Sequence, residues 1–429
     1  MRICTILLLL INFCFTQASG LALYGAGEKI GNIDVSSVAL GNSTFFSGSK
    51  YGITTSSPST LWKSSLTQFT IHSGINYLNI SSFPQQFQHN LTHFSLTFPV
   101  GNKKVFGFGL KPAFRTNKLE IETDLQYIGA DKNITGRPIA YKNRYMIDGG
   151  ISKIFLQYSS KINTRFSFGI QYSFLFGNQS NFENRYIYDV IIDSTTSSGT
   201  VISEFINGDN IFYVFAVNDE MEQVVKQNQF YSTELLMEVR YSMPNHEYVL
   251  RTTINGNTEV DTKQIQNINN LISSYNFNHS ASANISELSL GYHYKVANNS
   301  GVILESQFHS PFNIPEEVAL FNTMPPHEHS IHLGTYYLVE NPKYGYWNNL
   351  NLRGGGYLKQ FDFTDEKYFD YGFTFGLGFE YLTNTQAVNL TLCKGKRESS
   401  IIKGQYEDYI NIYFGITAGE KWFMKRRRK

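Results

Sequence analysis

The residues best suited to chemistry in this chain are histidines between positions 327 and 332, in the sequence PHEHSIH. His327, His329 and His332 lie close to Glu328 and are residue types that bind zinc. In a strand, His327 and His329 would share one face and His332 would point to the other, because successive side chains alternate. The spacing therefore favours a polar patch where a loop meets a strand over a metal site, and we expect no bound metal.

Nucleophilic catalysis is the second chemistry to consider. Serine and aspartate are abundant, but no G-x-S-x-G nucleophile motif is present. Two of the three cysteines lie within the first 20 residues, so Cys393 is alone in the rest of the chain and no disulfide framework can form. We expect neither an enzyme nor a bound cofactor.

The first 20 residues predict a secretory signal peptide. Arg2 precedes the apolar run ILLLLINFCF, and Ala18, Ser19 and Gly20 are small residues that allow cleavage after Ala18 or Gly20. No later segment reaches the roughly 18 consecutive apolar residues of a transmembrane helix. An exported chain of this kind is either soluble or a β-barrel.

The composition departs from that of an ordinary soluble domain. Charged residues make up 17% of the chain and aromatic residues 15%, whereas soluble domains carry roughly 25% charged residues. The formal net charge is +1, but the last five residues, 425–429, are all basic. No basic face exists outside that tail, so a nucleic-acid partner is not expected.

One segment, residues 368–382, shows the pattern most clearly, with the sequence YFDYGFTFGLGFEYL. Every second residue from Phe369 to Tyr381 is apolar, and the residues between them are small or polar. Fifteen residues is about three times the usual soluble strand but fits a tilted strand that crosses a bilayer, with aromatic residues at both interfaces. The pattern predicts that one set of side chains faces lipid (Phe373, Phe375, Phe379) and the other faces the lumen (Thr374, Gly376, Glu380).

The same alternation recurs, and fourteen such segments can be counted between residues 67 and 423. Short connections alternate with long polar ones, as in outer-membrane barrels. The short ones fall near 100–103, 160–162, 244–245, 297–301, 341–346 and 384–387, and the long ones near 81–89, 116–147, 177–227, 258–280, 310–325, 361–367 and 396–405. We therefore predict an all-β fold, a transmembrane antiparallel β-barrel of about 14 strands, with both termini on the periplasmic side.

A soluble β-sandwich would also contain alternating strands. The strand length and the regular alternation of connections argue against it. So do ionisable residues in mid-strand on the non-apolar face, which suit a wet or plugged lumen: Glu234, Glu238, Arg240, Arg251, Glu287, His293, Lys295, Glu305, Arg353 and Glu380.

The ends of the chain have no barrel pattern. Residues 21–66 are rich in glycine and serine and hold too few large apolar residues for a core of their own. They predict a plug inside the lumen, with a disordered periplasmic extension as the alternative. Residues 424–429 form a basic tail that we expect at the periplasmic membrane surface.

Fourteen predicted strands behind such a segment resemble the FadL family of outer-membrane transporters for hydrophobic compounds. Ser57, Pro58 and Ser59 look like part of that family's Asn-Pro-Ala plug motif, with serine in place of both asparagine and alanine. Residues 95–112, SLTFPVGNKKVFGFGLKP, look like its second and third strands with their turn. The architecture is also similar to that of PorV-like barrels, which serve protein secretion and surface attachment.

The resemblance implies passive transport of hydrophobic, fatty-acid-like molecules in the bacterial outer membrane, with sideways exit into the lipid. Gly107, Gly109 and Pro112 match the kinked strand that forms the family's lateral gate. The apolar run at 211–217, with Ile211, Phe212, Tyr213 and Phe215, could collect substrate on an outer loop or bind a partner. The expected partners are membrane lipid and a hydrophobic small molecule; the alternative, a PorV-like function, would add secreted proteins.

Overall fold

The computed structural model describes residues 19–420, except for 32–33, 81–85, 102, 117–118, 124–125, 129–138, 193–200, 208–209, 216–220, 269–270, 319–324, 340–349, 364–365, 382–385 and 400–403. Among the described residues, no helix is long and apolar enough to cross a membrane.

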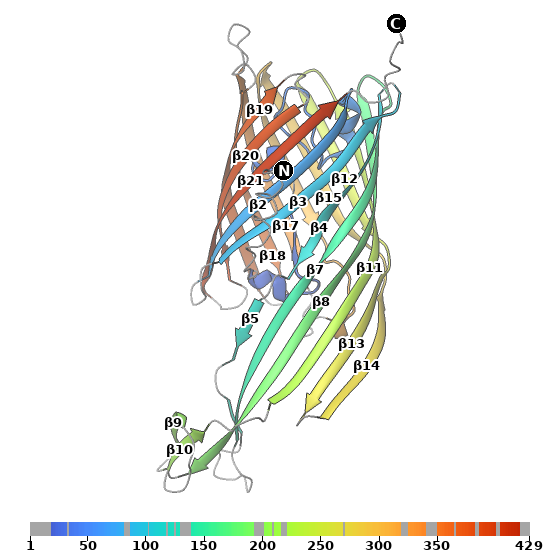
Figure 1. Ribbon diagram of the computed structural model, residues 1–429. Helices are drawn as coiled ribbons and strands as arrows, with labels where there is room; N and C mark the ends of the chain where they lie inside the picture. Colours follow the sequence, from blue (N-terminus) through green and yellow to red (C-terminus); the bar gives the residue numbers. More distant parts are fainter. Residues whose placement is uncertain are drawn as a thin grey trace, which may run out of the picture.

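Fourteen antiparallel strands close into a barrel (Figure 1). The ring closes where β2 pairs with β21, from Thr67↔Glu420 to Ile80↔Glu407. This confirms the predicted strand number and fold class. The barrel strands are β2 (Thr67–Ile80), β3 (Gln86–Pro99), β4 (Lys104–Arg115), β7 (Ile139–Lys161), β8 (Phe166–Ile192), β11 (Met221–Ser242), β12 (His246–Asn255), β15 (Asn284–Ala297), β16 (Ser300–His309), β17 (His327–Val339), β18 (Leu350–Asp362), β19 (Lys367–Tyr381), β20 (Gln386–Glu398) and β21 (Tyr406–Glu420).

The two faces of β19 are as the sequence predicts. Phe373 and Phe375 are 76% and 53% exposed and face outward, whereas Thr374 and Glu380 are buried on the inner face. The ionisable mid-strand residues named above also lie on inner faces and are buried or half-buried, except Lys295, which is exposed. Apolar side chains therefore cover the outside of the barrel, and charges are enclosed within it.

Three barrel strands continue beyond the others on the side of the long connections. β7, β8 and β11 have 23, 27 and 22 residues, whereas β12 and β16 have 10. Their outer halves, with β13 (Thr258–Ile268) and β14 (Leu271–Ala281) on one side and β5 (Leu119–Glu122) and β6 (Gln126–Ile128) on the other, form one sheet that we call the extension sheet (Figure 1). At its tip, β9 (Val201–Asn207) pairs with β10 (Asn210–Phe215).

The long polar connections predicted at 116–147, 177–227 and 258–280 are present, but the strands within them were not predicted. Much of each segment is strand. Outside the membrane both faces of a sheet can meet water, so these strands carry polar residues on both sides and lack the alternation that marks the membrane-spanning parts.

Residues 19–66, which we call the N-terminal segment, have little regular structure: η1 (Gly20–Leu23), β1 (Glu28–Lys29), α2 (Val35–Val38) and η2 (Pro58–Lys63). Leu40, Phe45 and Leu61 are buried. The segment contacts inward-facing side chains of the barrel, as where Thr391 Oγ1 donates to the Val35 carbonyl at 2.7 Å.

Candidate functional site

The barrel wall has a gap between β3 and β4. The two strands pair only from Pro99↔Val105 to Phe94↔Leu110. Beyond that point β3 continues to Gln86, paired with β2, and β4 continues to Arg115, paired with β7. Within the described residues, the outer half of β3 therefore has no strand on the side of β4, and the wall is open at that level.

The gap begins where β4 bulges. The pairing of β4 with β7 shifts between Pro112 and Phe114, so Ala113 is an extra residue on the β4 side. Proline lacks an amide hydrogen and cannot complete a ladder there. Pro112, predicted from the resemblance as a gate residue, thus lies where the two strands part.

Gly107 and Gly109, also predicted as gate residues, lie instead in the paired part of β4, opposite Thr97 and Ser95. A Cβ at Gly109 would be 2.4 Å from the Phe155 ring, and one at Gly107 would be 2.7 Å from the Gln157 amide. Both glycines therefore leave room for inner side chains and lie next to the gap, and their role in a gate stays a prediction.

The N-terminal segment occupies the edge that β3 leaves. β1 pairs with β4 through Glu28↔Arg115 and Lys29↔Phe114, and the Ile30 amide donates to the Ala113 carbonyl at 2.9 Å. Because β7 already holds the other edge of β4, β1 must lie on the side of the gap. The first residues of the segment therefore close the opening from inside.

Behind the gap lies a cavity of about 230 Å³. Lys111, Pro112 and Ala113 of β4 line it, together with Lys29 and Ile30 of the N-terminal segment. Charged side chains from across the barrel complete the lining, and most form ion pairs, such as Lys153–Glu234 at 2.6 Å, Arg251–Glu287 at 3.7 Å, Lys359–Glu328 at 3.1 Å and Arg397–Glu28 at 2.8 Å.

Two cations of the cavity are placed differently. Lys29 Nζ lies 2.7 Å from His309 Nδ1, a neutral acceptor when that nitrogen is unprotonated. Lys111 Nζ lies 5.2 Å from the centre of the Phe155 ring, and no described carboxylate is within ion-pair distance of it. Both amino groups lie next to the gap, so this end of the cavity offers hydrogen-bond donors to a polar or anionic group.

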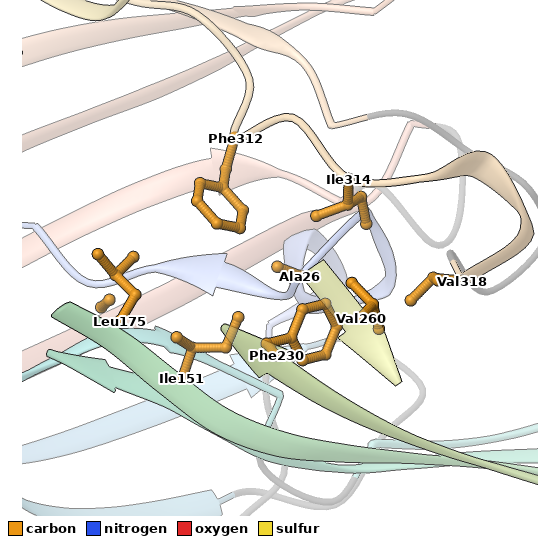
Figure 2. Close-up of a cluster of buried hydrophobic side chains, with 9 residues drawn as sticks. Ala26, Ile151, Leu175, Phe230, Val260, Phe312, Ile314 and Val318 are labelled. Carbon is orange, nitrogen blue, oxygen red and sulfur yellow. The ribbon is translucent and has the colours of Figure 1, made fainter. Parts of the chain in front are cut away.

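An apolar cluster (Figure 2) adjoins the cavity, because four of its residues also line the cavity: Ala26, Ala113, Leu175 and Phe312. Phe312, Ile314 and Val318, which follow β16, pack against wall residues of β7, β8, β11 and β13. Two small residues complete the cluster: Ala26 of the N-terminal segment and Ala113 at the β4 bulge. The residues that follow β16, the β4 bulge and the N-terminal segment are thus in contact through this one cluster.

Three glutamates of the wall hold the N-terminal segment. Glu407 accepts hydrogen bonds from Ser19 Oγ at 2.6 Å and the Gly20 amide at 2.9 Å. Glu305 accepts from Ser43 Oγ at 2.7 Å and the Thr44 amide at 2.9 Å. Glu238 accepts from the hydroxyls of Ser57 and Ser59. Each carboxylate therefore binds two neighbouring groups of the segment.

The predicted plug motif Ser57-Pro58-Ser59, which Glu238 binds, lies among buried charged side chains. Arg251 donates to Glu238 at 2.7 Å, and Arg240 donates to Ser57 Oγ at 2.8 Å and to Ser59 Oγ at 2.9 Å. All three charged side chains are buried. The two serines therefore lie between a buried carboxylate and a buried guanidinium group, which fixes their position.

Asp34 organises the middle of the segment. It accepts hydrogen bonds from the Ser36 amide at 3.0 Å, the Thr55 amide at 2.8 Å and Thr54 Oγ1 at 2.8 Å, joining the start of α2 to the stretch before η2. Burial favours a higher pKa, but the electrostatic interaction with nearby His72 and these hydrogen bonds outweigh it and lower the pKa of Asp34 from 3.8 to about 2.

This shift predicts a loss of stability in acid. Because the pKa of Asp34 is lower in the folded than in the unfolded protein, its contribution is complete above about pH 4 and is lost as the pH falls to about 2. The contribution is on the order of 2 kcal/mol. Denaturant unfolding at pH 7 and pH 3 should show a smaller difference for Asp34→Asn than for the parent protein. An equal difference for both proteins would contradict this assignment.

The other residues singled out in the sequence lie elsewhere. His332 points inward, with Nδ1 2.8 Å from the Gly41 carbonyl, while His327 and His329 contact the Phe308 ring on the opposite face. In the described part of the chain, no cluster of residues could hold a metal ion. Ile211 to Phe215 belong to β10, which pairs with β8 and β9, and residues 216–217 lie outside the described residues.

Comparison with solved structures identifies the class of fold. The CymD monoaromatic hydrocarbon channel superposes with a TM-score of 0.57 at 11% identity, covering 92% of this chain and 99% of its own. The TodX deltaS2S3 mutant channel gives 0.52 at 13% identity, with 91% and 99% covered, and a Pseudomonas aeruginosa FadL homologue gives 0.52 at 9% identity, with 92% and 100% covered. The chain has the fold of the FadL-type barrels, as the sequence resemblance implied.

The sequence family is a more specific assignment than this class of fold. A family model described as BamG matches residues 1–429, and the chain belongs to the BamG family. No curated protein matches the sequence. The similarity to PorV-like barrels stays a prediction.

Proposed function

We propose that this protein is a bacterial outer-membrane barrel that passes hydrophobic small molecules between the lipid and its lumen through the gap beside β4. The observation that carries the proposal is that the β3–β4 ladder ends midway, next to a lumenal cavity. An opening in the barrel wall at the level of the lipid would let the apolar tail of the transported molecule stay in lipid during the whole passage. The fold shared with CymD and the FadL homologue supports the same class of cargo.

The cavity lining supports a fatty-acid-like cargo over a plain hydrocarbon. Lys29 and Lys111 lie at the end of the cavity next to the gap. A carboxylate there would gain charge-assisted hydrogen bonds, while its chain could extend through the wall. Residues 21–66 act as the plug in this proposal, because β1 must leave β4 before anything passes.

Locking β1 to β4 with a disulfide should stop uptake. Lys29 and Phe114 lie opposite each other in an antiparallel ladder, where Cα separations suit a disulfide. In a Cys393→Ser background, Lys29→Cys with Phe114→Cys should reduce uptake of a radiolabelled long-chain fatty acid to that of cells without the protein when oxidised. Reduction of the disulfide should restore uptake to the level of the Lys29→Cys single variant.

The matched control is a disulfide where the wall is already closed. Leu377 and Leu390 are partners in the β19–β20 ladder on the lipid face, so Leu377→Cys with Leu390→Cys should leave uptake unchanged. Normal uptake in the fully oxidised β1–β4 variant would refute passage through this gap.

A second candidate function is docking of partner proteins, as in PorV-like barrels. The extension sheet favours it, because a lipid-to-lumen path does not need strands of 22 to 27 residues. Secreted proteins would be the partners in that case. If the β1–β4 disulfide leaves uptake unchanged while a secreted protein no longer reaches the surface, the docking function replaces transport.

A further inference from the structure

We propose that β14, the last strand of the extension sheet, binds an extended segment of a different polypeptide outside the membrane, which adds to the sheet as a further strand. The proposal is independent of passage through the barrel wall. It rests on the edge of the sheet, on the composition of β14 and on the geometry of two copies in one membrane.

The edge of β14 is long and regular. β14 pairs with β13 from Thr258↔Ala281 to Ile268↔Leu271 without a bulge, and no other described strand pairs with it. Its eleven residues, LISSYNFNHSA, include no lysine, arginine, acid or proline. Leu271 and Ile272 are 78% and 74% exposed. Proteins normally block such edges with charges, prolines, bulges or very short strands, because an open edge is a template for another strand.

The opposite edge of the same sheet is blocked in this way. β5 and β6 have only four and three residues. Glu120 of β5 accepts from Arg144 Nε at 2.7 Å, and Glu122 accepts from Lys142 Nζ at 2.5 Å. One sheet therefore has a short, charged edge on one side and, on the other, a long edge on which the one titratable side chain that can carry a charge near neutral pH is His279, 4.0 Å from Glu317. This asymmetry indicates that β14 is kept open for a partner.

The two faces of β14 define what the partner must offer. Tyr275 and Phe277 are about half exposed, and Phe277 lies opposite Thr262 on the face where Val260 is buried under the apolar cluster. On the other face, Asn278 donates to Asp261 at 2.8 Å. An added strand that continues both faces would be amphipathic, with apolar residues beside Tyr275 and Phe277 and polar residues on the opposite side.

A second copy of this chain does not meet these conditions. Antiparallel pairing of two β14 strands places a two-fold axis perpendicular to the sheet. The extension strands run along the barrel (Figure 1), so that axis would lie in the membrane plane and invert the second barrel. Parallel pairing about an axis along the strands would put the two apolar faces on opposite sides of the sheet. The partner is therefore a different polypeptide.

Hydrogen exchange of β14 tests the proposal directly. Deuterium uptake by peptides covering residues 271–281 should be measured in native outer-membrane fragments and in the purified protein in vesicles of the same lipids. A bound strand protects backbone amides, so exchange should be at least about tenfold slower in the native fragments. Fast exchange in both preparations would overturn the proposal. Slow exchange in both would mean that this chain covers its own edge, which also overturns it.

Charges placed on the edge provide the second arm. Ser274→Lys with Asn276→Lys should make exchange in native fragments as fast as in the purified protein, because lysines on an edge strand oppose pairing. The matched control puts the same two charges one strand inward, at Gln264→Lys and Gln266→Lys of β13, and should keep β14 protected. Migration on unheated gels checks that both barrels fold. Continued protection with the edge lysines would also count against strand addition.

Discussion

Replacing Glu238 by alanine is expected to destabilise the folded barrel by about 3 kcal/mol, the lower end for breaking a buried ion pair, since two buried guanidinium groups each lose one of their carboxylate partners. Glu238 is the buried carboxylate that Arg251 and both serines of the Ser57-Pro58-Ser59 motif contact. Without it, the buried guanidinium groups of Arg240 and Arg251 would keep only their other carboxylate partners, Glu247 at 3.2 Å and Glu287 at 3.7 Å. Guanidinium chloride unfolding of the vesicle-inserted protein measures the change.

The control for this change is Glu222→Ala. Glu222 pairs with Arg185 at 3.4 Å on the extension sheet, where both side chains are partly exposed, and such surface pairs contribute at most about 1 kcal/mol. Trp62, whose ring lies 4.5 Å from Lys161 Nζ, is a fluorescent reporter in the N-terminal segment. If Glu238→Ala lowers stability no more than Glu222→Ala does, the buried network does not hold the segment.

Phe375→Arg should lower stability by about 2–4 kcal/mol, the range measured for arginine at mid-membrane positions facing lipid. Phe375 lies near the middle of β19 on its exposed face. The matched variant is Phe369→Arg, on the same face of the same strand but near its end, where the expected loss is about 0–1 kcal/mol. Equal losses in bilayer unfolding experiments would mean that the lipid boundary is misplaced.

Thr374 is not the tolerant inner site that a wet lumen would provide. Its hydroxyl accepts from the Gly41 amide at 2.8 Å and donates to the Ala39 carbonyl at 3.0 Å. A Cβ added at the neighbouring inner position, Gly376, would be 2.3 Å from Ala39. Arginine at Thr374 would displace the N-terminal segment, so inner sites along this strand are packed against protein.

The membrane-spanning part of the fold could be predicted because lipid enforces a strict pattern. In a bilayer, each strand must present apolar residues on one face over its whole length, and residues 369–381 show this alternation without exception. The extension sheet escaped prediction because that constraint ends at the membrane surface. β14, for example, places Leu271 and Ile272 next to each other on opposite faces.

The candidate site was predictable only in part. The inward direction of Glu238, Arg240 and Arg251 follows from strand periodicity, but which groups they bind depends on the path of the N-terminal segment, which has no repeating pattern. Likewise, Pro112 marks a break in a ladder from its chemistry alone. One edge of β4 pairs first with β3 and then with β1. The pairing with β1 joins residues more than 80 positions apart, such as Glu28 and Arg115, so it could not be read from a local pattern.

The closed ring has a consequence for how the chain folds. The final seam joins β2 to β21, the first and last barrel strands, over the whole of Thr67–Ile80. The N-terminal segment precedes β2, yet Glu407 on β21 holds Ser19. Contacts between such distant parts of a chain form slowly, because a very long loop must first be closed. The N-terminal segment must therefore fill the interior before or while β2 pairs with β21. In a nascent chain that lacks β21, neither the edge of β2 nor Ser19 has this partner.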